Sequence, residues 1–221
     1  MNIFYFVDHL VVVNSDFLVI GGGLAGLSFA LEASEFGSVI ILAKDSFKQS
    51  SSAWAQGGMS AVVSQEVESR RDSVSQHLKD TITAGCGLVN ERVAEDIIAE
   101  GQDVVDFLLK QGVDFDQDAS GFLLGKEGGH STRRILHHKD LTGMEMTEKL
   151  ERACRENPNI TFYDDHYVID LITTGKQGLV TDDRVIGCYA LDEKQSSVKV
   201  VKSNRVLLAV SYTHLTLPTI A

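Results

Sequence analysis

The chain has 221 residues, 43% of them hydrophobic, which is enough for one globular domain with a sizeable core or for two small domains. Its 31 acidic and 20 basic residues give a net charge of −11, which argues against a nucleic acid or an anionic membrane surface as the main partner. Three widely spaced cysteines, odd in number and outside any C-x-x-C arrangement, indicate neither a disulfide framework nor a zinc site and favour a reducing compartment.

The first 15 residues are largely apolar, and Asp8 and His9 interrupt the apolar run. No basic residue precedes the apolar run and no small-residue cleavage site follows it, so a signal peptide is not predicted. The run is also too short to span a bilayer. We expect residues 1–15 to be an N-terminal extension, either a leader or an extra edge strand before the first core strand.

The segment from Asp16 to Leu27 reads DFLVIGGGLAGL, a short apolar strand that leads directly into a G-x-G-x-x-G motif at Gly21, Gly23 and Gly26. In dinucleotide-binding proteins the first glycine of this motif permits a tight turn. The second lets the backbone approach the pyrophosphate, and the third lets the helix pack close to the strand. The N–H groups at the start of the helix then point at the anion.

The flanking sequence supports this interpretation on both sides. Residues 24–36 have helical apolar spacing, and we expect Gly37 to end the helix in a left-handed conformation. An apolar strand follows at 38–43, which completes a strand, helix, strand unit. The alternative is a glycine turn in some other parallel α/β protein.

The acidic residue that commonly ends the second strand and holds the ribose is missing, since Ala43 and Lys44 occupy this place. Two interpretations of Lys44 remain open. It lies along the adenosine of the dinucleotide, or it is a solvated loop lysine.

The next segment, SSSAWAQGG at residues 50–58, is predicted to be a loop. Its small residues and glycines expose backbone N–H groups, and its hydroxyls and amide can pair with the nitrogens and carbonyls of a planar polar ring. Serine and glycine clusters are usually plain loops. Placed just after a dinucleotide-binding unit, this one indicates a flavin rather than a nicotinamide.

Further helices are expected at 72–84, at 90–110 with Asn90 as N-cap and a close contact or mild bend at Gly101, and at 141–156. Residues 112–140 read as a long polar, glycine-rich connection. From Ile160 onward the pattern changes to short β segments, which are expected at 161–163, 167–173, 185–191, 198–202 and 205–210.

The segment GKEGGHSTRR at residues 125–134 gathers Glu127, His130, Arg133 and Arg134 around two glycines. A guanidinium can hold a carboxylate in a bidentate fork, so the arginines suit a dicarboxylate, and Glu127 can accept a hydrogen bond from a substrate ammonium. The alternative is that His130, with His137 and His138, is an ordinary loop residue and that the arginines are surface charges or partners of the excess acids. Their gathering on one loop favours a substrate site.

Three segments together resemble the L-aspartate oxidase family of flavoproteins. They are the glycine motif at 16–27, SSAWAQGG at 51–58, and EGGHSTRRILH at 127–137, which is followed by DLTG at 140–143. The resemblance covers nearly all of residues 16–209, and its second and third segments are far more specific than the first. It implies an α/β fold: a Rossmann-like FAD-binding domain with a parallel sheet and an additional β segment, truncated here.

The resemblance also implies the reaction and the residues that serve it. Members of this family oxidise L-aspartate to iminoaspartate by hydride transfer to FAD, the first step of NAD biosynthesis. Oxygen or fumarate reoxidises the flavin, and quinolinate synthase consumes the product. By position, Glu127 and His130 are the expected substrate-orienting residues. The expected cofactor-binding residues are Gly21, Gly22, Gly23, Leu24, Ala25, Gly26, Lys44, Ser51, Ser52, Ala53, Trp54, Ala55, Gln56, Gly57 and Gly58.

The runner-up is the flavoprotein subunit of fumarate reductase or succinate dehydrogenase, which belongs to the same superfamily. In those enzymes a histidine five residues before the Gln-Gly or Glu-Gly pair carries the flavin covalently, whereas Ser51 occupies that position here. The resemblance therefore implies noncovalent FAD. A third hypothesis is a non-catalytic flavin-binding or structural module.

The resemblance stops after Ala209, where the family continues with Thr-Gly-Gly. Residues 210–221 resemble translated vector sequence, with a short terminal strand as the alternative. The family's catalytic arginine lies beyond this end, so no catalytic residue is assigned and we expect the 221-residue chain alone to be inactive. The expected organisation is an extension at 1–15, the first part of an FAD-binding domain at 16–209 and an unrelated tail at 210–221. We expect a cytoplasmic protein with no metal, nucleic acid or membrane partner.

Overall fold

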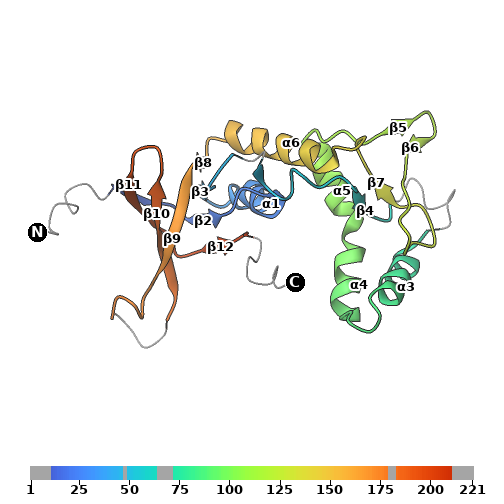
Figure 1. Ribbon diagram of the computed structural model, residues 1–221, viewed down its shortest axis with the longest axis horizontal. Helices are drawn as coiled ribbons and strands as arrows, with labels where there is room; N and C mark the ends of the chain where they lie inside the picture. Colours follow the sequence, from blue (N-terminus) through green and yellow to red (C-terminus); the bar gives the residue numbers. More distant parts are fainter. Residues whose placement is uncertain (1–10, 47–48, 64–71, 179–182, 211–221) are drawn as a thin grey trace, which may run out of the picture. The chain divides into compact units, whose positions relative to one another are not determined.

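The computed structural model describes residues 11–46, 49–63, 72–178 and 183–210 of the chain (Figure 1). The fold divides into two compact units. The first is made of Met1–Ser51 and Leu150–Ala221, and the second is Ser52–Lys149. Within the described residues, no helix combines the length and the apolar character that crossing a membrane requires.

The first unit contains a parallel four-stranded sheet at the place where the sequence predicts a dinucleotide-binding fold. Its two central strands have the sequences FLVI and VIIL, continuous apolar runs of the kind that parallel sheets bury on both faces. The strand order is β12, β2, β3, β8, and all neighbours run parallel. The strands are β2 (Phe17–Ile20), β3 (Val39–Leu42), β8 (Ile160–Tyr163) and β12 (Val206–Leu208).

A second four-stranded sheet provides the additional β segment. Its order is β1, β11, β10, β9, with β1 parallel to β11 and the other neighbours antiparallel. The strands are β1 (Val11–Asn14), β9 (His166–Thr173), β10 (Val185–Asp192) and β11 (Ser197–Lys202). Residues 11–14 are therefore an edge strand, while residues 1–10 and 211–221 lie outside the described part.

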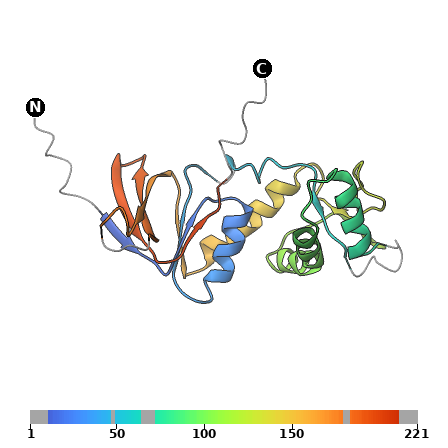
Figure 2. The ribbon, with the colours of Figure 1, turned by 90° about the horizontal axis from the view of Figure 1, so that it is seen from below.

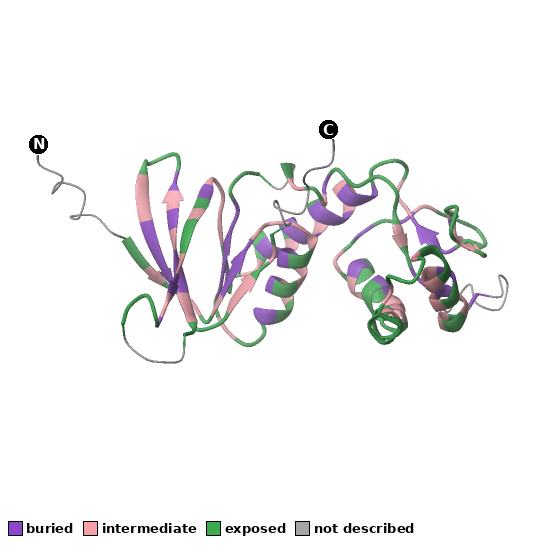
Figure 3. Ribbon diagram, turned by 60° about the horizontal axis from the view of Figure 1, so that its bottom comes forward, coloured by how far each residue is buried: buried purple, intermediate pink, exposed green. Residues whose placement is uncertain are grey.

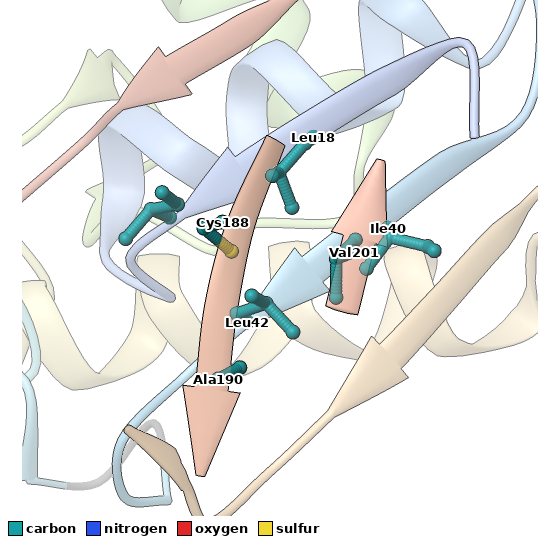
Figure 4. Packing of buried hydrophobic residues seen from close by; sticks show 7 residues of the cluster. Leu18, Ile40, Leu42, Cys188, Ala190 and Val201 are labelled. Atoms are coloured by element: carbon teal, nitrogen blue, oxygen red, sulfur yellow. The ribbon is translucent and has the colours of Figure 1, made fainter. Parts of the chain in front are cut away.

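The two sheets share an apolar core (Figure 4). Leu18 and Ile40 point from the parallel sheet toward Cys188, Ala190 and Val201 of the second sheet, and all these residues are buried. Alternate residues of a strand point to opposite faces, so Leu18 faces the second sheet while its neighbour in sequence, Val19, faces α1. Burial raises the pKa of the Cys188 thiol to about 11, so this cysteine acts as a small apolar residue.

Helix α1 (Leu24–Ala33) and the part of α6 (Thr142–Glu156) that begins at Leu150 lie side by side in Figure 2 and cover the other face of the parallel sheet. The buried Cys154 of α6 donates its S–H to the Leu27 carbonyl of α1, at 3.5 Å. The predicted left-handed cap at Gly37 is wrong. Helix α1 ends at Ala33 with Ser34 as a right-handed C-cap, and Gly37 is needed because a Cβ there would lie 2.6 Å from the Asp16 carboxylate.

Helices α3 (Val74–Ala84), α4 (Glu91–Ala99) and α5 (Gly101–Lys110) lie entirely within the second unit. Asn90 is the N-cap of α4, as predicted, and its side chain accepts a hydrogen bond from the Val93 N–H. The single helix predicted at 90–110 is instead two helices that meet at Glu100. A Cβ on Gly101 would lie 3.4 Å from Ala61, which is the close contact that the sequence suggested.

Residues 112–140 are more ordered than a long connection. They contain the hairpin of β5 (Gln117–Asp118) and β6 (Gly121–Phe122), and β7 (Ile135–Leu136), which pairs antiparallel with β4 (Met59–Ser60). Phe115 and Leu136 are almost completely buried. Figure 3 shows buried residues on β7 and along one side of α3 and α5. The apolar residues of 112–140 have neither helical nor strand spacing, so periodicity in the sequence could not predict that they form a core.

Candidate cofactor and substrate site

The glycine turn has the geometry that close approach to a phosphate requires. Gly21 has a φ of +117°, and a Cβ there would lie 2.4 Å from the Ala209 carbonyl oxygen. A Cβ on Gly26 would lie 2.0 Å from the Gly21 carbonyl oxygen, so the third glycine lets α1 begin directly against the turn. Gly23 is the N-cap of α1 and has no side chain between the helix N-terminus and a ligand. The residues present fit a bound pyrophosphate.

Lys44 lies just beyond the end of β3, and its side chain is exposed. Because β2 and β3 are parallel neighbours, the residues that follow both strands lie at the same edge of the sheet. Lys44 is therefore at the edge where the glycine turn begins. Its contact with adenosine stays a prediction.

The loop at 51–58 is held by backbone contacts at both ends. The Ala55 N–H donates to the Ser52 carbonyl at 3.2 Å, and the Gly143 N–H at the start of α6 donates to the Ala55 carbonyl at 2.9 Å. A Cβ on Gly143 would lie 2.0 Å from the Ser52 carbonyl oxygen. Any larger residue than glycine at 143 would displace this loop.

The other end of the loop is fixed against β7. Gly58 has a φ of +98°, and a Cβ there would lie 2.5 Å from the Leu136 carbonyl oxygen. Between these anchors Ala53 is buried, whereas Trp54 is 69% exposed and a Cβ on Gly57 would meet no atom within 4 Å. The loop is thus held at both ends and has an open outer side, which is compatible with the predicted contact to a flavin ring.

Arg134 has a structural role, whereas the sequence analysis expected it to bind a substrate carboxylate. Its side chain is completely buried. Its Nε and Nη2 atoms donate to the two carboxylate oxygens of Asp72 at 2.9 and 2.8 Å, and its Nη1 donates to Asp80 at 2.7 Å. Nη2 also donates to the Thr132 hydroxyl. Arg134 is a partner of buried acids, so the expectation that both arginines bind a dicarboxylate is wrong for Arg134.

We call Asp72, Asp80 and Arg134 the buried ion cluster. Burial is the largest influence on the Asp72 pKa and raises it, but hydrogen bonds from Arg134 and Thr132 outweigh it and the pKa is lowered overall. The pKa of Asp80 is lowered further, because bonds from the Ser131 N–H, Arg134 and the Ser131 hydroxyl overcome burial. Both carboxylates are therefore ionised at neutral pH, and the cluster carries a net charge of −1.

Glu127 and His130, the two expected substrate-orienting residues, lie in one turn. The His130 N–H donates to the Glu127 carbonyl at 3.0 Å. Glu127 is exposed, and the half-buried ring of His130 contacts the ring of His77 on α3 edge to face, with centroids 6.0 Å apart. The structure thus brings Glu127 and His130 together and leaves the Glu127 carboxylate free to meet a ligand.

The other candidates on this segment have different surroundings. The Nδ1 of His137 is 3.1 Å from the Asp116 carboxylate, and the Nδ1 of His138 is 2.8 Å from the Asp114 carbonyl. The Nδ1 atoms of both histidines thus have partners within this segment, which is compatible with the ordinary loop interpretation. Arg133 is exposed, and its Nη1 makes only a long 3.4 Å contact to the Leu124 carbonyl. It remains the arginine of this segment that can meet a carboxylate.

Three residues that support the Glu127 turn were missed: Asp72, His77 and Asp80. The only local signal was three polar residues, Asp72, Gln76 and Asp80, four apart at the start of an expected helix. The Gln76 side chain does donate to Asp80, at 3.0 Å. The spacing gave no indication of Arg134, the cation that these acids surround.

The predicted site residues therefore form three groups. The glycine turn, Lys44 and Ser51 belong to the first unit, whereas the loop from Ser52 to Gly58 and the Glu127 turn both belong to the second unit. The loop and the turn have a common neighbour in β7, whose Leu136 meets Gly58 and whose Ile135 N–H bonds to the Gly125 carbonyl.

Known proteins resemble this chain in sequence and in fold. Residues 16–214 match the family described as FAD binding domain. The chain is 39% identical over 200 residues to L-aspartate oxidase 1 of Ralstonia nicotianae and 37% identical over 200 residues to L-aspartate oxidase of Vibrio cholerae. These matches cover 89% and 88% of the chain and 36% of each relative. The chain thus spans about a third of the length of the curated relatives that it matches.

Solved structures give the same fold at lower identity. An Escherichia coli quinol fumarate reductase FrdA carrying the E245Q mutation matches with a TM-score of 0.80 and 24% identity, over 90% of this chain and 33% of the other. The Mycobacterium smegmatis Sdh1 complex in its apo form matches with a TM-score of 0.77 and 26% identity, over 90% of this chain and 34% of the other.

Proposed function

Because the chain belongs to the family of FAD-binding domains, we propose that it is the first part of a flavoenzyme that oxidises L-aspartate to iminoaspartate. The observation that carries the proposal is the placement of Glu127 and His130 in one turn closed by a backbone hydrogen bond, next to Ser131, which donates to Asp80 of the buried ion cluster. This turn lies in the same unit as the loop at 52–58. The L-aspartate oxidases support the substrate, since they are 37–39% identical to the chain in the two comparisons above, against 24–26% for the fumarate reductase and Sdh1 structures.

The chain's residues have separate tasks in this proposal. The glycine turn and the start of α1 hold the pyrophosphate of FAD, and the loop at 51–58 contacts the isoalloxazine ring. Glu127 accepts a hydrogen bond from the substrate ammonium, while Arg133 attracts a substrate carboxylate. FAD supplies the hydride acceptor. Orientation of the substrate by fixed groups contributes to the rate, because it removes part of the entropic cost of reaching the reactive geometry.

The main alternative is a fumarate reductase or succinate dehydrogenase flavoprotein, which shares the fold. Ser51 argues against it, because serine offers no imidazole for a covalent bond to the flavin at this position. We therefore propose noncovalent FAD. Acid precipitation tests this point: the yellow colour should stay in the supernatant, and flavin that remains with the precipitated protein would contradict it.

We also propose a position for this enzyme in a biosynthetic pathway. Iminoaspartate would be consumed by quinolinate synthase in the first steps of NAD biosynthesis, with oxygen or fumarate as the electron acceptor. A cytoplasmic location agrees with three free cysteines, of which Cys154 and Cys188 are buried.

The decisive experiment is turnover by the full-length protein loaded with FAD. We expect hydrogen peroxide production that depends on L-aspartate, and succinate formation when fumarate replaces oxygen. A Glu127→Gln variant should lose most of the kcat/KM for aspartate, whereas Glu91→Gln, at an exposed position in the first turn of α4, should not. Oxidation of succinate in place of aspartate would favour the alternative, and FAD binding without either activity would favour a non-catalytic module.

A further inference from the structure

The second sheet of the first unit contains a buried ionic group that the proposed function does not use. Lys199 of β11 donates to Asp192 at the end of β10 and to Nε2 of His166 at the start of β9, the latter at 2.9 Å. All three residues are buried, and we call them the Lys199 group. Apolar side chains of similar volume often replace such a group without loss of stability. The strands that it joins are also paired through their backbones, so stability alone does not explain it.

The hydrogen bonds assign a charge to each member of the Lys199 group. The ammonium of Lys199 has only donors, so Nε2 of His166 is an acceptor. The other ring nitrogen, Nδ1, is 2.6 Å from the Asp164 carbonyl and therefore carries the proton. The hydrogen bond from Lys199 is the main cause that lowers the pKa of Asp192, followed by the bond from the Gln195 N–H. His166 is thus a neutral ring held at both nitrogens beside a lysine–aspartate ion pair.

The backbone of His166 connects this group to the end of β3. The His166 N–H donates to the Ala43 carbonyl at 3.0 Å, and the Ala43 N–H donates to the Tyr163 carbonyl at 3.0 Å. Ala43 is buried, and both of its backbone polar groups are bonded to residues at the two ends of the β8–β9 connection. A Cβ on Gly22 would lie 3.2 Å from the Ala43 Cβ, so the glycine turn lies directly against Ala43. Lys44 is the next residue along the chain.

We propose that the Lys199 group positions the edge of the parallel sheet that binds the adenosine and pyrophosphate half of FAD. Its hydrogen bonds fix the His166 ring, the His166 backbone fixes Ala43, and Ala43 sets the places of Gly22 and Lys44. Dinucleotides bind at this edge in related folds, beyond the carboxyl ends of the strands. The three residues act here through the backbone, so they are positioning residues. The inference rests on FAD binding and not on the oxidation of aspartate.

Two variants and a matched control test the Lys199 group. Lys199→Met removes the ammonium and leaves Asp192 and the His166 ring without their donor. The double variant Lys199→Met/Asp192→Asn leaves no buried charge, so it serves if the single variant does not fold. Lys176→Met is the control, because Lys176 also donates to an aspartate of the same unit, Asp170 at 2.7 Å, but both side chains are exposed.

The experiment measures binding by the full-length apoprotein at a temperature where every variant is folded. Flavin fluorescence gives the dissociation constant of FAD, and competition against FAD gives that of ADP. Because ADP has the adenosine and two phosphates but no isoalloxazine ring, it reports on the proposed edge alone. The absorbance spectrum of FAD at saturation reports on the surroundings of the ring, and the melting temperature of the apoprotein reports on stability.

We expect Lys199→Met to raise the dissociation constants of FAD and ADP by the same factor, about tenfold, the scale of one lost hydrogen bond to a charged group. The spectrum of the bound flavin should not change, the double variant should show the same pattern, and Lys176→Met should show no effect. A loss for FAD without one for ADP, a changed flavin spectrum, or unchanged affinities at any melting temperature would overturn the inference. Failure of the proposed function gives another result, because the wild-type protein would then bind FAD without oxidising aspartate.

Discussion

The two units of this chain bring distant segments together by different means. In the first unit, strands from the beginning and the end of the chain pair in ladders, and an apolar cluster that includes Leu18, Ile40 and Val201 fills the space between two sheets. In the second unit, the sheets formed by the described residues have two strands each, and Arg134 joins the start of the α3 segment to the segment before β7 through ionic hydrogen bonds to Asp72 and Asp80.

Substitutions should destabilise the two units in different ways. An apolar core loses stability in proportion to the volume removed, whereas a buried ion cluster fails when a single partner leaves a charge uncompensated. The first unit also contains a buried ionic group, in which Lys199 donates to His166 at 2.9 Å and to Asp192. Its strands are nevertheless paired through continuous backbone ladders, so that group is not their only connection.

The largest effect is expected from Arg134→Met. Removing the cation leaves two buried carboxylates beside one another, which should lower the free energy of unfolding by about 3–5 kcal/mol. Urea unfolding measures the change, with the exposed Arg133→Met as control at less than about 0.5 kcal/mol. Equal small losses in both variants would show that the ion cluster does not hold the second unit together.

A loss of similar or smaller size is expected from Leu18→Ala in the core of the first unit. Leu18 is completely buried, so truncation should cost about 2–5 kcal/mol depending on how far the two sheets close the cavity. Leu88→Ala is the matched control, because Leu88 is 93% exposed. Thermal unfolding followed by circular dichroism gives both values, and a loss at Leu88 as large as that at Leu18 would contradict the assigned core.

Glycine substitutions sharpen the comparison at the cofactor contacts. Gly26→Ala forces a methyl group against the Gly21 carbonyl and should cost about 1–3 kcal/mol while strongly weakening FAD binding. Gly57→Ala meets no atom within 4 Å and should leave stability unchanged. Flavin fluorescence titration of the full-length protein measures the affinities. If Gly57→Ala weakens FAD binding and Gly26→Ala does not, the prediction is wrong. Contact between the loop and the flavin ring, rather than packing within the protein, would then be what restricts residue 57 to glycine.

The smallest effect is a pH dependence that belongs to the second unit. The folded-state pKa of His77 is below the unfolded value of about 6.5, so the unfolded state takes up the proton first as the pH falls. Stability should therefore decline as the pH falls from 7 to 5.5 in the wild type, and it should decline less in His77→Phe. The lowered pKa values of Asp72 and Asp80 act in a separate window, where stability is lost as the pH falls below about 4. Parallel curves for both proteins from pH 7 to pH 5.5 would contradict the assignment to His77.

Much of the first unit could be predicted because the sequence patterns that indicate its strands, turn and helices each lie within one short segment. The apolar runs that become β2 and β3, the glycine spacing of the turn and the helix at 142–156 each depend on residues near one another in the sequence. One error had a cause outside the segment. Helix α1 ends at Ala33, and Gly37, which was predicted to be its cap, instead makes room for the Asp16 side chain, a contact that spans 21 residues and has no periodic signal.

The sequence by itself determined the parallel sheet, the glycine turn and the gathering of Glu127 and His130 on one segment. Only the tertiary structure decided that Arg134 bonds to Asp72 and Asp80, which lie 62 and 54 residues before it, and that His77 meets His130. The physical reason is that periodicity records which face of an element is apolar. The pairing of a buried charge depends on which other segment supplies the opposite charge, and no spacing within either segment records that choice.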